Sequence, residues 1–268
     1  MVNGDASGER PDRASSFGAI ADDYDRWRPG PSPSVVEWLI PAAARRVVDI
    51  GAGTGALSRL LVGRAHDIVA VEPDARMRQV LARSVPEATV LEGQGERIPV
   101  DDASVDAVVV SSAWHWMDVD ATVAEVARVL RPHGVLGVVW AGVDWRADWF
   151  TALRQTVRQD RTSERVGLLG SLIDEEVPGE SHTLRLPAAA PFEPPEQVWL
   201  SWDQPMSANQ LVGMLGTFSG VIVLSEQQRR QIMDETRQLL RRYAGLEGDA
   251  AVTLPFRANC WRTVRRSA

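Results

Sequence analysis

The sequence predicts an α/β protein built on a doubly wound, mostly parallel β-sheet. Short runs of β-branched and apolar residues alternate with stretches of helical periodicity, which is the pattern of strands buried beneath helices on both faces. A glycine-rich turn at residues 51–55 follows the first of these runs, and Glu72 ends the second. Ligands bind such sheets beyond the carboxyl ends of the strands. The same observations therefore indicate a fold class and a binding site.

Two helices are expected before the sheet. Residues 1–14 are polar and rich in Gly, Asp and Arg, so we expect a disordered tail there. A helix is predicted over residues 15–28, because apolar side chains recur at spacings of three and four. These side chains are Phe17, Ile20, Tyr24 and Trp27. Three prolines follow, and Ser34 is the expected cap of the second helix.

The alternation of strands and helices extends from residue 47 to residue 140. Each expected strand is a short apolar run, and each expected helix carries apolar residues on one side. Strands are expected at residues 47–50, 68–72, 88–92, 105–110 and 135–140, with helices at 56–62, 73–83 and 121–130 and a turn at 131–134.

The alternation ends after residue 140. Further strands are expected at residues 198–202 and 252–262, and further helices at 207–218 and 225–242. No repeat and no clean linker divides the chain, so residues 15–268 are expected to form one domain. Residues 143–225 are expected to contain a cap, inserted between the fifth and sixth strands, that covers the substrate.

Composition argues against several classes of function. The net charge is -7 and the pI about 5.2, so a nucleic acid is not the expected partner, because an acidic surface repels phosphates. The single cysteine, Cys260, allows no intramolecular disulfide, and the four histidines lack metal-ligand spacing. The N-terminus resembles no signal peptide, and no apolar window is long enough to span a membrane. A cytoplasmic location is the resulting expectation.

Residues 47–57 carry the functional argument. A strand is followed by alternating glycines and then by a helix. Glycines permit a sharp turn and a close approach of the backbone to a ligand, and the helix directs its free N–H groups toward that ligand. At the end of the second strand, the Glu72 carboxylate can accept hydrogen bonds from two ribose hydroxyls. Gly51, Gly53 and Ala56 also fit the dinucleotide pattern G-x-G-x-x-G/A, so this pattern alone leaves the cofactor undecided.

Asp49 before the turn and Gly55 as a third alternating glycine make the segment resemble the first motif of class I methyltransferases that use S-adenosylmethionine (SAM). The resemblance implies that Asp49 helps to hold the methionine amino end. It implies that the turn wraps the cofactor through Gly51, Ala52, Gly53 and Gly55.

Two further segments resemble motifs of the same class. Glu72, Pro73 and Met77 resemble the second motif, in which an apolar side chain packs on adenine. Gln94, Gly95 and Glu96 resemble the third. Relatives commonly have an aspartate at the position of Gln94, but its amide oxygen can still accept a hydrogen bond from the adenine amino group.

The resemblance extends to both ends of the chain. Residues 17–29 are similar to the lid helix of the ubiquinone-biosynthesis-like and trans-aconitate-methyltransferase-like members of methyltransferase type 11. Residues 129–134 and 254–264 are similar to their turn into the fifth strand and their C-terminal segment. This implies a seven-stranded sheet of order 3-2-1-4-5-7-6 with strand 7 antiparallel, and lid helices over residues 15–45. Tyr24 and Arg28 would then contact the cofactor, the alternatives being helix packing and a surface position.

The loop after the fourth strand, at residues 111–118, is expected at the methyl-transfer site. Ser111 at its start is expected to contact the cofactor, and His115 is the candidate general base that removes a proton from a substrate oxygen or nitrogen. A structural role for His115 is the alternative. The tryptophans in and near the expected site loops favour an apolar or aromatic acceptor.

The predicted function is transfer of the SAM methyl group to an oxygen, nitrogen or carbon atom of a small molecule. One alternative is a SAM-fold protein repurposed as a non-methylating enzyme or a binding protein. The other is a nicotinamide-dependent dehydrogenase. All 29 basic residues are arginines, which excludes the dehydrogenases that use a Tyr-x-x-x-Lys pair and leaves other dehydrogenases open.

Overall fold

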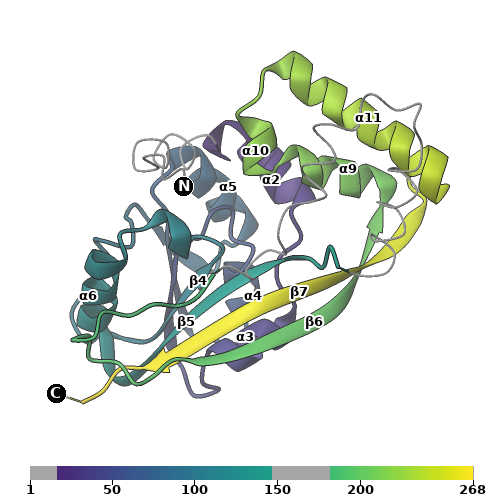
Figure 1. The fold of residues 1–268 in the computed structure, drawn as a ribbon. Helices are drawn as coiled ribbons and strands as arrows, with labels where there is room; N and C mark the ends of the chain where they lie inside the picture. The colour runs from purple at the N-terminus through teal and green to yellow at the C-terminus, as the bar shows by residue number, and fades with distance from the viewer. Residues whose placement is uncertain (1–16, 147–181, 268) are drawn as a thin grey trace, which may run out of the picture.

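The computed structural model describes residues 17–146 and 182–267 (Figure 1). The predicted tail at residues 1–14 lies outside the described residues, and so does the part of the predicted cap at residues 147–181.

A seven-stranded sheet forms the centre of the molecule, in the order β3-β2-β1-β4-β5-β7-β6. β7 pairs antiparallel with β5 and β6, and the other pairs are parallel. The predicted strand order and the antiparallel seventh strand are therefore confirmed. The strands are β1 (Arg46–Ile50), β2 (Asp67–Val71), β3 (Ala88–Leu91), β4 (Val105–Ser111), β5 (Leu130–Val143), β6 (Glu196–Ser207) and β7 (Ala251–Val264).

Helices cover both faces of the parallel part of the sheet. Successive side chains of a strand point to opposite faces, so Val47 of β1 packs in the same cluster as Leu39 of α3, whereas Val48 packs with Val126 of α6. Both faces are buried, as the apolar runs predicted. The helices of this part are η1 (Phe17–Ile20), α2 (Ala21–Trp27), α3 (Pro33–Leu39), α4 (Ser58–Leu61), α5 (Ala75–Ser84), η2 (Trp114–Trp116) and α6 (Val119–Val129).

A separate group of helices follows β6. α9 (Ala208–Gly216), α10 (Ser219–Ile222) and α11 (Glu226–Ala244) lie beyond the ends of β6 and β7, with α2 beside α9 (Figure 1). The predicted strand at residues 198–202 and the predicted helices at 207–218 and 225–242 correspond to β6, α9 and α11. Residues 196–207 belong to the sheet, and the helices that follow them enter between β6 and β7 rather than between the fifth and sixth strands. β6 is an edge strand in which only Met206 is buried and the other residues are exposed or partly exposed, so its sequence lacks the long apolar run of the buried strands.

Several predicted boundaries also change. The helix predicted at residues 56–62 is reduced to α4, because three positive-φ glycines keep the chain in a turn before it. α3 begins at Pro33 with Ser32 at its N-cap, so Ser34 is not the cap. α5 begins after Asp74, whose side chain accepts hydrogen bonds from the Arg76 and Met77 backbone N–H groups. The turn predicted at residues 131–134 is an irregular part of β5.

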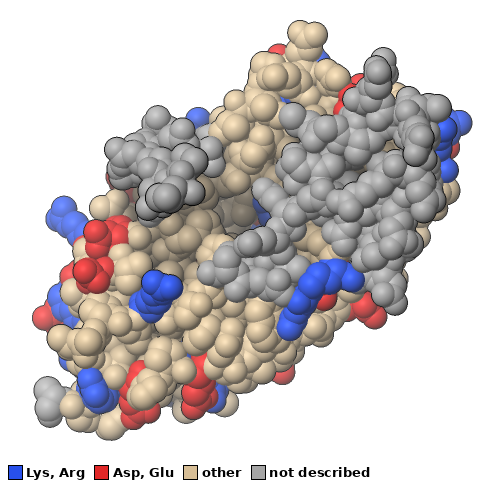
Figure 2. Space-filling view, in the orientation of Figure 1, with Lys and Arg blue, Asp and Glu red and all other residues tan. Residues whose placement is uncertain are grey.

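None of the described helices is long and apolar enough to cross a membrane. On the face shown in Figure 2, acidic and basic side chains are scattered, and most of the described surface is uncharged.

Candidate cofactor-binding site

A cavity of about 390 Å³ lies where the strand order reverses between β1 and β4. This is the position at which doubly wound sheets bind ligands. The structure brings together there many of the residues that the sequence predicted. Those that line the cavity are Tyr24, Gly51, Gly53, Glu72, Pro73, Met77, Gln94, Gly95, Glu96 and Ser111.

The three alternating glycines have positive φ angles but different surroundings. A Cβ on Gly53 would meet no atom within 4 Å, so this glycine opens directly onto the cavity. A Cβ on Gly51 would lie 2.7 Å from the Ala113 Cβ, which shows how closely the loop after β4 packs on the turn. A Cβ on Gly55 would lie 2.5 Å from Leu81 Cδ1. Gly55 therefore serves the packing of the turn on α5 and is not among the residues that line the cavity.

Ala52 also points away from the cavity. It is buried in a small cluster with Ala70, Leu81 and Val85, and its N–H donates to the Val71 carbonyl over 3.2 Å. Its side chain fixes the turn on β2 and α5.

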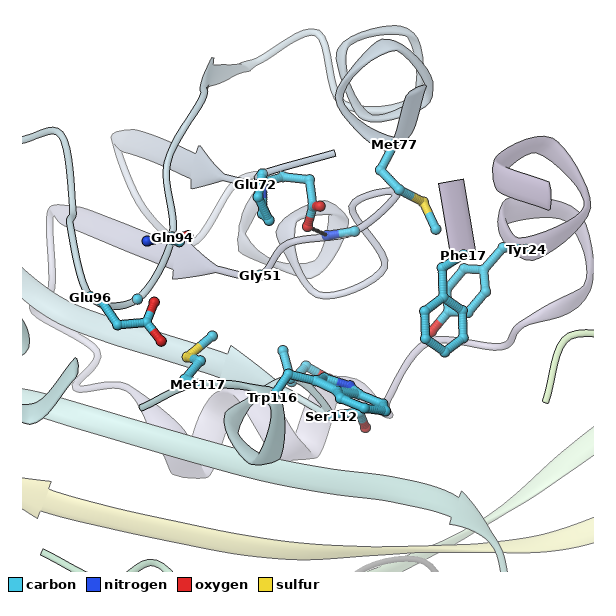
Figure 3. Close-up of a pocket in the computed structure, with 15 residues that line it drawn as sticks. Phe17, Tyr24, Gly51, Glu72, Met77, Gln94, Glu96, Ser112, Trp116 and Met117 are labelled. Atoms are coloured by element: carbon cyan, nitrogen blue, oxygen red, sulfur yellow. Dashed lines mark hydrogen bonds between the residues drawn. The ribbon is translucent and has the colours of Figure 1, made fainter. Parts of the chain in front are cut away.

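The Glu72 carboxylate holds the turn next to the end of β2. Its Oε2 accepts a hydrogen bond from the Gly53 N–H over 2.9 Å (Figure 3). Its Oε1 accepts one from the Asp74 N–H over 2.9 Å. Burial raises the pKa of Glu72, and these two backbone N–H groups oppose the rise. Each carboxylate oxygen can accept more than one hydrogen bond, so both can still receive a hydroxyl from a ligand in the cavity.

Asp49 is fully buried beneath the turn. Its Oδ2 accepts a hydrogen bond from the Ser58 hydroxyl over 2.6 Å, whereas its Oδ1 is shielded from water and has no hydrogen-bond partner among the described residues. Burial, with the nearby Glu72 charge, raises the pKa of Asp49 to about 7. A buried acceptor without a donor is costly. An ammonium group beside Oδ1 would remove that cost and favour the ionised carboxylate.

Gln94, Gly95 and Glu96 form the wall opposite Phe17 and Tyr24 (Figure 3). A Cβ on Gly95 would lie 2.6 Å from Met117 Sδ, so Gly95 packs closely on Met117 and a larger residue would displace that side chain. Glu96 accepts a hydrogen bond from the Asp118 N–H over 2.6 Å, which ties this wall to the start of α6.

Five lining residues were not predicted as site residues: Phe17, Ser112, Ala113, Trp116 and Met117. Phe17 contacts Tyr24 edge to face at 5.7 Å between ring centroids, and it contacts Trp116 at 6.3 Å. These contacts join the N-terminal segment to the loop after β4. The sequence placed the loop at residues 111–118 at the site. That placement could have identified the four lining residues that belong to this loop, and it could not have identified Phe17.

The predicted residue His115 does not line the cavity. Its Nδ1 accepts a hydrogen bond from the Trp140 indole N–H over 3.2 Å, and its ring lies against Trp116 and His182. Because an indole N–H can only donate, Nδ1 carries a lone pair and the imidazole proton is on Nε2. The lone pair of Nδ1, with which a neutral imidazole would accept a proton, is therefore occupied by the hydrogen bond from Trp140 near the end of β5.

Arg28 is likewise not among the residues that line the cavity. Its Nε–H donates to the Thr217 hydroxyl over 2.9 Å, at the C-terminal end of α9. The structure therefore gives Arg28 a contact with the helices that follow β6.

The cavity fits SAM on the evidence of its own groups. The Glu72 carboxylate suits ribose hydroxyls, and the open space at Gly53 suits a ligand close to the backbone. Asp49 is not among the residues that line the cavity. It lies fully buried beneath the turn, so its contact with the amino end of the cofactor stays a prediction. Pro73, Met77 and the Gln94 amide offer apolar and polar contacts to an adenine ring.

Comparisons with known proteins agree with this assignment. A family model described as a methyltransferase domain matches residues 48–138. An uncharacterised methyltransferase of Mycobacterium tuberculosis (strain ATCC 25618 / H37Rv) is 37% identical over 253 residues, which cover 94% of this chain and 97% of the relative. A ubiquinone/menaquinone biosynthesis C-methyltransferase of Rubrivivax gelatinosus is 32% identical over 101 residues, covering 37% of this chain and 40% of that protein.

A solved structure described as a type II methyltransferase, from Anaeromyxobacter dehalogenans, has the same fold. It superposes with a TM-score of 0.56 and 23% sequence identity, covering 89% of this chain and 97% of that one. The nearly full-length match at 37% identity decides the family and, with it, the choice between SAM and a nicotinamide cofactor. The chain belongs to the class I SAM-dependent methyltransferases.

Proposed function

We propose that the protein transfers the methyl group of SAM to an oxygen, nitrogen or carbon atom of a small apolar or aromatic molecule. One observation carries this proposal. A single cavity combines a polar end, formed by Gly53 and Glu72, with an aromatic end, formed by Phe17, Tyr24 and Trp116. The first end suits the cofactor and the second suits an acceptor beside it.

SAM supplies a methyl group that is already activated for transfer to a nucleophile. The chain's task is to hold the acceptor in line with it and to exclude water, and proximity of this kind lowers a barrier by roughly 7–11 kcal/mol. Glu72 and the glycine turn would hold the ribose, Asp49 the amino end, and Met77 with Gln94 the adenine. Phe17 and Trp116, which contact each other and line the cavity, would keep water from the acceptor.

The charge of the cavity supports a small uncharged acceptor. Among the described residues that line it, Glu72 and Glu96 are acidic and none is basic. A phosphate backbone or another polyanion would meet like charge there. A volume of about 390 Å³ lies in the range of cavities that bind small molecules.

His115 enters this proposal as a residue that orients the loop after β4. Its hydrogen bond from Trp140 anchors η2, whose Trp116 lines the cavity. The proposal therefore relies on positioning of the acceptor and does not use the His115 ring as the general base.

The test is methyl transfer from SAM labelled on its methyl carbon to a whole-cell extract, followed by separation of small molecules from protein and nucleic acid. Label in the small-molecule fraction, and in an apolar extract of it, supports the proposal. Label in protein or nucleic acid contradicts it. The variant Gly53→Arg, which fills the cavity, is the control and should transfer no label.

A further inference from the structure

The N-terminal segment that forms part of the cavity wall also contacts helices that lie outside the cavity. We call η1 and α2, residues 17–27, the lid, because Phe17 and Tyr24 of this segment line the cavity. The lid contacts α5 on one side and α9 on the other. Trp27 of the lid, which does not line the cofactor cavity, forms one of its contacts with α9.

The first contact is a close packing of α2 on α9. A Cβ on Gly213 would lie 2.4 Å from the nearest ring atom of Trp27, so the indole rests directly on the α9 backbone. Only glycine permits this approach, which places the C-terminal end of α2 beside the C-terminal end of α9.

The second contact is a polar one, made by Arg28 immediately after α2. Its Nε–H donates to the Thr217 hydroxyl over 2.9 Å, and its Nη2 lies 3.4 Å from the Thr217 carbonyl oxygen. The Thr217 hydroxyl donates its own hydrogen to the Met214 carbonyl over 2.6 Å. Because the Thr217 hydroxyl hydrogen is used in the bond to Met214, an oxygen lone pair is left to accept the hydrogen bond from Arg28. Thr217 is also buried, with only 1% of its surface exposed.

The Arg28 guanidinium also lies between two aromatic rings. Its central carbon is 5.5 Å from the centre of the Tyr24 ring and 4.5 Å from the centre of the Phe218 ring. Tyr24 belongs to the cavity wall, whereas Phe218 follows Thr217 at the start of α10. Arg28 therefore links a wall residue of the cavity to a fixed point on the helices between β6 and β7.

We propose that Arg28 and Thr217 are positioning residues that act through Tyr24 and hold the lid over the cofactor. The role goes beyond the proposed acceptor chemistry and is independent of it. Phe17 and Tyr24 of the lid form part of the cavity wall, so we expect the release rate to follow the fraction of molecules in which the lid is open. Loss of the Arg28–Thr217 contact raises that fraction, although neither side chain is in the cavity.

The experiment measures the dissociation rate of S-adenosylhomocysteine, the product form of the cofactor, by stopped-flow displacement. Arg28→Ala and Thr217→Val should each raise this rate about tenfold, the size of one lost hydrogen bond of a charged group. Thr217→Ser keeps the hydroxyl and should release the ligand at the wild-type rate. The double variant should release it no faster than Arg28→Ala alone, because both changes remove the same contact.

A matched control separates this role from simple loss of stability. The buried Thr236 hydroxyl donates to the Ile232 carbonyl over 2.8 Å, within α11 and without an arginine partner among its hydrogen bonds. Thr236→Val removes the same kind of bond. It should lower the melting temperature and leave the dissociation rate unchanged.

A second ligand separates positioning from direct contact. 5′-Methylthioadenosine lacks the amino-acid end of the cofactor. If Arg28 acts through the lid, Arg28→Ala speeds release of both ligands by a similar factor. Faster release of S-adenosylhomocysteine alone would show that Arg28 binds the amino-acid end and would overturn the proposal. An unchanged rate of S-adenosylhomocysteine release in Thr217→Val would also overturn the proposal. If methylthioadenosine binds too weakly to be measured, the Thr217→Val rate is the deciding result.

Discussion

The backbone N–H of Gly53 donates a 2.9 Å hydrogen bond to the carboxylate of Glu72. This bond joins the turn after β1 to the residue after β2, and both residues line the same cavity. The turn is thus held open by the side chain that is expected to bind the ribose. We therefore expect both cofactor binding and the local structure to depend on this one carboxylate.

Replacement of Glu72 by Gln should weaken cofactor binding. A glutamine side chain has one accepting oxygen and one donating NH₂ group. Either the Gly53 or the Asp74 N–H would therefore face that NH₂ group and lose its hydrogen-bond acceptor. We expect the Kd for S-adenosylhomocysteine to rise by about tenfold to a hundredfold, as for one or two lost charge-assisted bonds. Calorimetric titration measures this. Glu92→Gln, at an exposed carboxylate after β3, is the control, and equal affinities in the two variants would contradict the role of Glu72.

Gly53→Ala and Gly63→Ala form a matched pair. Both glycines have positive φ, +58° and +79°, and a Cβ at either position meets nothing within 4 Å. Each change should therefore lower the free energy of unfolding by a similar amount, about 1 kcal/mol. Only Gly53 lines the cavity, so only Gly53→Ala should reduce affinity for S-adenosylhomocysteine. Denaturant unfolding and calorimetry of both variants provide the test, and a loss of affinity in Gly63→Ala would count against it.

The stability of the ligand-free protein should depend on pH through Asp49. Its pKa is raised from 3.8 to about 7 by burial, so the folded state binds a proton more tightly than the unfolded state does. The contribution of this proton to the free energy of unfolding is present below about pH 4 and is lost as the pH rises through about 7.

Comparison with Asp49→Asn isolates this effect. The wild-type free energy of unfolding, measured with urea and taken relative to the variant, should fall between about pH 4 and about pH 7. A difference that instead grows with rising pH would show that the pKa of Asp49 is lowered in the folded protein.

The His115 ring should carry its proton on Nε2 at neutral pH. The Trp140 indole N–H is directed at Nδ1 over 3.2 Å and can only donate. Nitrogen-15 NMR of the imidazole should therefore show an unprotonated Nδ1 and a protonated Nε2. Trp140→Phe removes the donor and should mix the two tautomers. A proton on Nδ1 in the wild-type protein would rule out the observed hydrogen bond.

The parts of the site that the sequence predicted are those set by local chemistry. A strand, alternating glycines and a helix define the turn within a few residues, and Glu72 follows from its place at the end of the next strand. Ala52 and Gly55 belong to the same turn, but their orientation depends on contacts with α5, which no local pattern specifies.

Contacts between distant segments account for what the sequence did not predict. Phe17 reaches the cavity because η1 crosses to η2, and Arg28 meets Thr217 across 189 positions of the chain. The strand order was predicted through the family resemblance and is confirmed. The strand predicted at residues 198–202 lies within β6, whereas the contact of the helices after β6 with α2 depends on segments far apart in the chain.

The most direct test of the account is calorimetric titration of the purified protein with S-adenosylhomocysteine and with NAD, beside the variant Gly53→Arg. If the cavity binds SAM, we expect one micromolar site for S-adenosylhomocysteine, loss of that site in a folded Gly53→Arg protein, and no binding of NAD. Binding of NAD, or unchanged affinity for S-adenosylhomocysteine when the space at Gly53 is filled, would contradict the assignment of this cavity to SAM.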